Sequence, residues 1–149
     1  MTLKDRITED MKDAMRAKAA PRLSTIRLLL AAIKQREVDE RRMLSDGDVV
    51  AVIDKMVKQR KDSIAQFEAG NRKDLADAER AELAILDAYL PQRASESEID
   101  RAVDAALAAA RAAGASGPAL IGKAMAALKG QLAGRADMAA VSAKVKSRI

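Results

Sequence analysis

The 149-residue sequence contains no cysteine and no histidine. Without cysteine there is no disulfide and no thiolate ligand for zinc. Without histidine the chain lacks the side chain that most often acts as a general base near neutral pH. Ser–His and Cys–His nucleophile systems are therefore excluded, and no glycine pattern of the Walker A or dinucleotide-binding type occurs. We expect no metal, no cofactor and no intrinsic catalytic site, although lysines and carboxylates leave enzymes formally possible.

Aromatic residues are almost absent, with one Phe, one Tyr and no Trp. A sheet built on aromatic and β-branched pairs is therefore disfavoured. For the same reason, nucleic-acid bases cannot stack on a series of aromatic side chains, as they do on many single-strand binders. Phe67 and Tyr89 occupy apolar positions near expected helix ends, where core packing is the simpler role. Any bound RNA is expected to be recognised by its backbone and shape.

Long apolar runs are also missing. No stretch approaches the ~18 consecutive apolar residues that a membrane span requires. The N-terminal residues Met1–Arg6 are charged and lack the apolar core of a secretory signal peptide. The absence of cysteine fits a reducing compartment. We therefore expect a soluble cytoplasmic protein with no membrane contact.

Helix-forming sequence is abundant, since 33 alanines stand against 7 glycines and 3 prolines. Apolar residues recur at helical spacing in seven segments. Capping residues and prolines mark the expected starts at Thr2, Pro21, Ser45, Asn71, Ser95, Ser116–Pro118 and Asp137. Glycines that favour a left-handed stop follow three of these segments, at Gly70, Gly114 and Gly134. The predicted fold class is all-α.

A boundary is expected near Pro91. Leu90 must leave the helical region because it precedes a proline. Composition changes at the same point, since 19 of the 33 alanines lie in the 58 residues that follow. We expect a four-helix N-terminal bundle over residues 1–91, a proline hinge, and a three-helix C-terminal tail over residues 95–149.

The net charge of +5 is concentrated at the C-terminal end. Residues 1–91 carry 18 basic and 17 acidic side chains, whereas the stretch from Gly114 carries six basic side chains and one acid, Asp137. Concentrated positive charge favours a polyanionic partner through counterion release. The bland alternative is a solvated surface that only maintains solubility. The predicted phosphate contacts are Lys123, Lys129, Arg135, Lys144 and Arg148.

A second basic stripe is expected on the second helix. Arg27, Lys34 and Arg41 are seven residues apart and therefore share one face. Arg27 and Lys34 are candidates for a second RNA-binding surface. Acidic residues are interleaved on helices two and three, however, and could pair with the basic ones. This acid–base mosaic supports an alternative function, a protein-interaction module that docks on a tRNA-handling enzyme.

Several segments match a known family almost from end to end. The matching segments are 22–29, 31–34, 58–67 with Gly70, 74–76, 79–82, 85–86, 89–91, 121–125 and 134–138 with Val141. They resemble the GatB/YqeY family, which includes stand-alone relatives of the tail region of the tRNA-dependent amidotransferase B subunit. One departure is Met138, which stands where a small residue, often Gly, is common in the family.

The resemblance implies a helical bundle followed by a three-helix tail. The similar tail of the amidotransferase contacts tRNA while catalysis occurs elsewhere, so we expect a non-catalytic adaptor for tRNA or other structured RNA. Gly122 and Gly134 would allow close approach, and Asp137 would have a structural role at the last helix. A second alternative is a carbon–nitrogen ligase with glutamine as amido donor. That description would be inherited from the full enzyme, whose kinase-like module and glutamine-hydrolysing subunit have no counterpart in this sequence.

Overall fold

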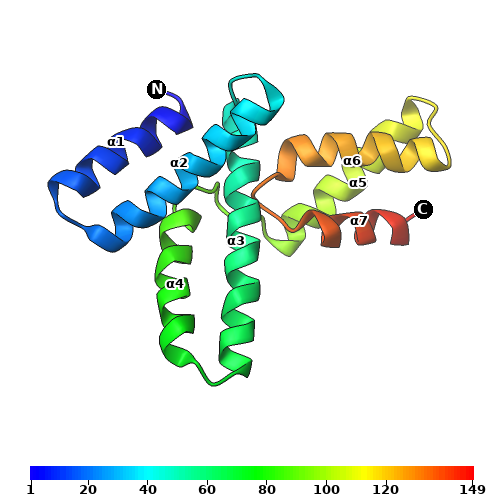
Figure 1. The fold of residues 1–149 in the computed structure, drawn as a ribbon. Coiled ribbons are helices and arrows are strands. Elements are labelled where there is room, and N and C mark those ends of the chain that lie inside the picture. The colour runs from blue at the N-terminus through cyan, green and yellow to red at the C-terminus, as the bar shows by residue number, and fades with distance from the viewer. The chain divides into compact units, whose positions relative to one another are not determined.

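A computed structural model describes all 149 residues, and it contains helices but no strand. The helices are α1 (Leu3–Arg16), α2 (Ala20–Glu40), α3 (Asp46–Ala69), α4 (Lys73–Asp87), α5 (Glu96–Ala112), α6 (Pro118–Leu132) and α7 (Met138–Ser147), as Figure 1 shows. The predicted all-α class is confirmed. None of the seven helices is long and apolar enough to cross a lipid bilayer. The chain divides into two compact units, here called the N-terminal unit (Met1–Leu90) and the tail unit (Pro91–Ile149). The hinge between them remains a prediction.

The N-terminal unit contains α1 to α4. Helices α3 and α4 run antiparallel, and both extend beyond the region where α1 and α2 pack (Figure 1). Its core is rich in β-branched residues, with Ile7, Ile26, Ile33, Ile53 and Leu86 fully buried. Tyr89, which follows α4, lies against this core, and its hydroxyl donates a hydrogen bond to Asp10 of α1. This contact joins the end of the unit to its beginning.

The tail unit contains α5, α6 and α7 around a separate core. Branched residues fill its centre, and buried alanines let the helices approach closely. The buried residues include Val103, Ala106, Leu107, Ala110, Ala124, Leu128, Val141 and Val145. The alanine enrichment of the C-terminal sequence therefore reflects the packing of a small three-helix unit.

Most helix starts follow the capping signals of the sequence. Thr2 and Ser45 form full capping boxes with Asp5 and Asp48. Ser95 accepts a hydrogen bond from the backbone N–H of Glu98, but Glu98 does not complete a capping box by accepting from the Ser95 N–H. The Glu98 carboxylate instead pairs with Arg135 of the tail unit, at 2.8 Å.

The expected turn between the third and fourth helices was wrong in detail. Gly70 was expected to be left-handed and Asn71 to start α4. Gly70 has φ −89°, whereas Asn71 has φ 56°, and α4 begins after Arg72 without a side-chain cap. Asn tolerates the left-handed conformation because its short polar side chain can bond locally. The backbone N–H groups of Asn71 and Arg72 donate to Glu68 and Phe67, which satisfies the last carbonyls of α3.

Candidate interaction surfaces

Lys144 and Arg148, both expected to contact phosphate, are engaged with acids of α5. Lys144 Nζ lies 2.6 Å from Glu96 Oε2 and 2.8 Å from Asp100 Oδ1. Arg148 is 2.8 Å from Asp100 and 2.7 Å from Asp104. The hydrogen bonds from Lys144 and then Arg148 hold the pKa of Asp100 below its ordinary value. These two cations therefore join α7 to α5, and only part of their charge is available to an outside partner.

Arg135 is also held within the tail unit. Its Nη2 lies 2.8 Å from Glu98 Oε2, and its Nε donates to the backbone oxygen of Gln92 at 2.9 Å. The Arg135 backbone oxygen accepts from the Ala94 N–H at 2.8 Å. These bonds tie the segment before α5 to the α6–α7 turn. The turn itself requires Gly134, which is buried with φ 74°.

Lys123 and Lys129 differ from the other three predicted phosphate contacts. Both are exposed on α6, and neither makes an ion pair or hydrogen bond. Helical positions advance by ~100° per residue. Gly122, Ala126 and Gly130 therefore lie on the arc between the two lysines, and all three are exposed. An added Cβ at Gly122 or Gly130 would meet no atom within 4 Å. We call this surface the α6 face: Lys123, Lys129, Gly122, Ala126 and Gly130.

The start of α7 is fixed by Asp137, whose Oδ1 accepts a hydrogen bond from the Ala139 N–H at 3.1 Å. Met138, the residue that departs from the family pattern, begins the helix and packs partly buried against the tail core. Asp137 therefore caps α7, as the sequence pattern predicted.

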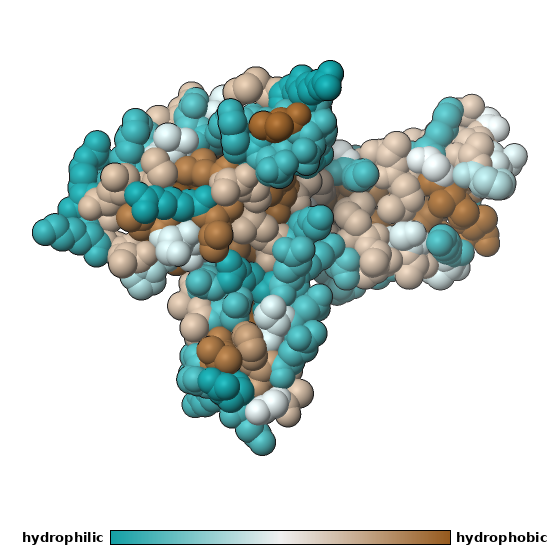
Figure 2. All heavy atoms as spheres, viewed as in Figure 1, coloured by the Kyte–Doolittle hydropathy of each residue, from teal (hydrophilic) through white to brown (hydrophobic).

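On α2, Arg27 and Lys34 are exposed and make no ion pair. Arg41 is likewise exposed without a partner, and it ends the helix with a left-handed φ of 53°. The three cations lie beside exposed apolar side chains of the same helix, Leu28 and Val38. In Figure 2 apolar atoms reach the surface over α2 and at its connection to α3.

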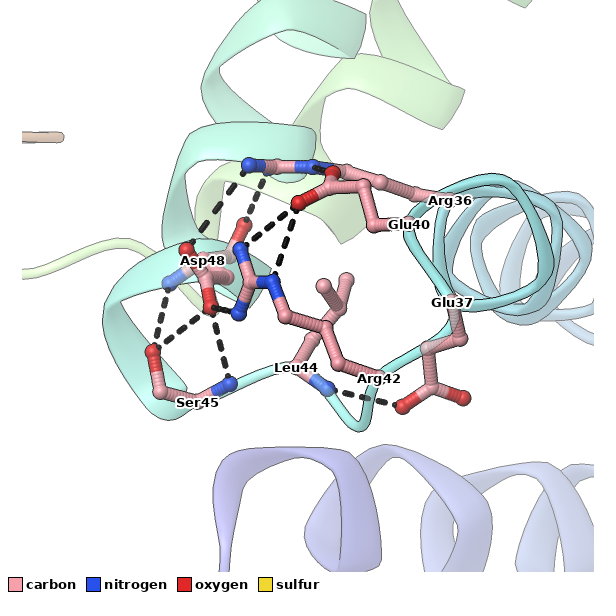
Figure 3. Close-up of polar contacts among 7 residues, drawn as sticks. All are labelled: Arg36, Glu37, Glu40, Arg42, Leu44, Ser45 and Asp48. Carbon is pink, nitrogen blue, oxygen red and sulfur yellow. Dashed lines mark hydrogen bonds and ion pairs between the residues drawn. The ribbon is translucent and has the colours of Figure 1, made fainter.

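The α2–α3 connection is held by a polar network (Figure 3). Arg42 donates to Glu40 at 2.7 Å and to Asp48 at 2.6 Å, while Arg36 also bonds both acids. The bond from Arg42, with those from Ser45, holds the pKa of Asp48 far below its ordinary value. Because Asp48 also completes the α3 capping box, the network fixes the first turn of α3 to the last turn of α2.

Glu37 is the buried acid of this region, with a side chain only 6% exposed. It accepts from Lys4 Nζ of α1 at 2.7 Å and from the Leu44 N–H at 2.9 Å (Figure 3 shows the second bond). The hydrogen bond from Lys4, followed by that from Leu44, lowers the pKa of Glu37. This carboxylate therefore connects α1, α2 and the α2–α3 connection.

Sequence reasoning missed the acids that neutralise the tail cations, although a signal was present. Glu96, Asp100 and Asp104 recur every four residues, as do Lys144 and Arg148. Residues four apart share a helix face. The two rows could therefore have been expected to face each other. The polar network around Arg42 and Asp48 could not have been expected from the sequence, because it depends on how the α2–α3 connection folds.

The fold defines a class of protein: an all-helical chain that divides into two compact units. The chain belongs to the YqeY family, since the model of the Yqey-like protein family matches residues 4–149. The predicted membership in the YqeY family is thereby confirmed.

Similar fungal proteins carry the name altered inheritance of mitochondria protein 41, mitochondrial. The one from Pyrenophora tritici-repentis is 33% identical over 128 residues, which covers 85% of this chain and 71% of the relative. The one from Lachancea thermotolerans is 44% identical over 102 residues, covering 65% and 54%, respectively. The chain thus matches only about half the length of several such relatives. Their names mention neither RNA nor amido transfer, so these expectations remain predictions.

The names contradict the expected cytoplasmic location, because the relatives are named as mitochondrial proteins. The expectation rested on the missing cysteines and on the missing secretory signal. Neither feature distinguishes the cytosol from the interior of an organelle, because the absence of a secretory signal bears only on export from the cell. The cytoplasmic assignment is therefore withdrawn.

Proposed function

We propose that this protein is a non-catalytic adaptor that binds tRNA or another structured RNA through its tail unit. The observation that carries the proposal is the α6 face, where Lys123 and Lys129 have no acidic partner within the chain. Binding of the two ammonium groups to phosphates would release counterions and so favour association.

The exposed glycines of the α6 face support the same function. A glycine inside a helix costs about 0.5–1 kcal/mol relative to alanine. No contact within the chain requires Gly122 or Gly130, since a Cβ at either position would meet nothing within 4 Å. A flat strip between two lysines lets a sugar–phosphate backbone approach the helix closely. The lack of aromatic stacking partners on this face favours recognition of backbone and shape.

Ion pairs within the tail unit reduce the number of predicted phosphate contacts that are free to bind RNA. Lys144, Arg148 and Arg135 each face carboxylates of the tail unit, so their contribution to phosphate binding is smaller than that of Lys123 and Lys129. We therefore assign the main contact to α6 and a supporting one to these three cations.

The test is a titration of fluorescently labelled tRNA with the full chain at low salt. The charge-reversal variant Lys123→Glu/Lys129→Glu is compared with Lys61→Glu/Lys73→Glu, which makes the same charge change at exposed, unpaired lysines of the N-terminal unit. We expect the α6 variant to bind at least about 10-fold more weakly, on the order of 1 kcal/mol per phosphate contact, and the control to change by less than about 3-fold. Equal losses in the two variants, or no binding by the unaltered chain, would refute the proposal.

A further inference from the structure

We propose that the outward side of α2 is a docking site for an acidic amphipathic helix of a protein partner. This surface, called the α2 face, consists of Arg27, Leu28, Lys34 and Val38 of α2, with Arg41 and Met43 after the helix. It lies in the N-terminal unit and is separate from the α6 face, so the inference goes beyond the proposed RNA binding.

The α2 face gathers exposed apolar side chains. Leu28, Val38 and Met43 are 50%, 59% and 72% exposed. Seven large apolar side chains of the chain are exposed, and two of them, Met1 and Ile149, are the terminal residues. Three of the remaining five therefore lie on α2 or directly after it. Single exposed apolar residues need no explanation, but their concentration beside one helix indicates a binding site.

The cations of the α2 face make no ion pair or hydrogen bond, and only Lys34 lies close enough to an acid, Glu37, to help lower its pKa. Glu37 is occupied by Lys4 and the Leu44 N–H, and Glu40 by Arg36 and Arg42. Asp39 accepts a hydrogen bond from Gln35 at 2.9 Å. Glu37 and Glu40 are thus bonded to cations outside the α2 face, while Arg27, Lys34 and Arg41 form no ion pair that a partner's carboxylates would have to displace.

The C-terminal part of the α2 face is held in place before any partner binds. Glu37 accepts from the Leu44 N–H through its side chain, and its backbone oxygen accepts from the N–H groups of Arg41 and Arg42. Arg42 bonds to the acids of the network in Figure 3, and its neighbours in sequence, Arg41 and Met43, are exposed. Together with Lys34, Val38, Arg42 and the bonded acid Glu37 they line a shallow hollow of about 330 Å³. A surface fixed in this way loses less conformational entropy on binding.

Charge and spacing favour an acidic helix over other partners. A second copy of the chain would bring Arg27, Lys34 and Arg41 against their own counterparts, and like charges repel. RNA would satisfy the cations but would leave the exposed Leu28, Val38 and Met43 without contacts. A helix that packs along α2 presents carboxylates every seven residues, or ~10 Å, which matches the spacing of the three cations, and apolar residues between them.

The test uses a labelled synthetic 21-residue peptide with leucines at heptad positions a and d and flanking glutamates. A peptide of the same composition, reordered so that no apolar face forms, serves as its control. By fluorescence anisotropy with the full chain, we expect the amphipathic peptide to bind at least about 10-fold more tightly than the reordered one. Arg27→Glu/Arg41→Glu and Leu28→Gln/Val38→Gln should each lose about 10-fold or more.

The matched control is Arg93→Glu/Arg101→Glu, which makes the same charge change at two exposed, unpaired residues of the tail unit and should bind within about 2-fold of the unaltered chain. Equal binding of the two peptides, no binding of either, or unchanged affinity in both α2 variants would overturn the inference. So would loss of tRNA binding in Arg27→Glu/Arg41→Glu without any peptide binding, since that result assigns the face to RNA. A failure of Lys123→Glu/Lys129→Glu to weaken tRNA binding bears only on the proposed function.

Discussion

Replacing the two exposed glycines of α6 by alanine should make the tail unit more stable and RNA binding weaker. Each Gly→Ala change in a helix interior raises the free energy of unfolding by about 0.5–1 kcal/mol. Gly122→Ala/Gly130→Ala meets no atom within 4 Å at either added Cβ, so no steric cost is set against this gain. The two changes together should stabilise α6 by about 1–2 kcal/mol, a factor of about 5–30 in its opening equilibrium.

Amide hydrogen exchange read by mass spectrometry measures this effect locally. Peptides from α6 should exchange about 5–30 times more slowly in the double variant, while peptides from α1 to α4 should be unchanged. In the same variant, tRNA binding should weaken because two methyl groups now stand between Lys123 and Lys129. Slower exchange with unaltered tRNA affinity would show that the glycines are not a contact surface. Faster exchange would show that the helix requires them for its own packing.

Three further changes test the rest of the structure. Because the pKa of Asp100 is lowered in the folded state, its ion pairs stabilise the tail unit at pH values above the unfolded pKa of about 4, and this stabilisation is lost as the pH falls toward the lower folded pKa. Thermal melts from pH 5 to 3 should therefore show a fall in melting temperature that is smaller in Asp100→Asn. Identical pH profiles of the two proteins would contradict the ion-pair assignment. Leu128 is fully buried in the tail core, so Leu128→Ala should lower the free energy of unfolding of the tail unit by about 2–5 kcal/mol and speed hydrogen exchange in α5 to α7 only; equally faster exchange in α1 to α4 would argue against separate cores. Burial and then the hydrogen bond to Asp10 raise the pKa of Tyr89, so an absorbance titration of this single tyrosine should show ionisation above about 10, shifted downward in Asp10→Asn; an ordinary value in the unaltered chain would refute the Tyr89–Asp10 contact.

Local signals in the sequence predicted the helices well, because they depend on neighbouring residues. Thr2, Ser45 and Asp137 cap the helices that they were expected to cap. The turn after α3 was assigned to Gly70 because glycine usually takes the left-handed position, and Asn71 takes it instead. The choice between two adjacent permissive residues depends on how α4 must leave the turn, which the local sequence does not specify.

The surfaces were harder to predict because they depend on distant residues. Counting charges along the C-terminal stretch treated Lys144 and Arg148 like Lys123 and Lys129. Their difference arises from α5, whose acids lie more than 40 residues earlier and pack against α7. Likewise, the sequence placed Arg27 and Lys34 on one face, but not the network that occupies the neighbouring acids Glu37 and Glu40.

The central claim, that Lys123 and Lys129 neutralise RNA phosphates, is tested most directly by the salt dependence of tRNA affinity. The slope of log K against log salt falls by about 0.9 for each duplex phosphate contact that is lost. Lys123→Gln/Lys129→Gln should therefore reduce the magnitude of the slope by nearly 2 relative to the unaltered chain. An unchanged slope in this variant would contradict the claim.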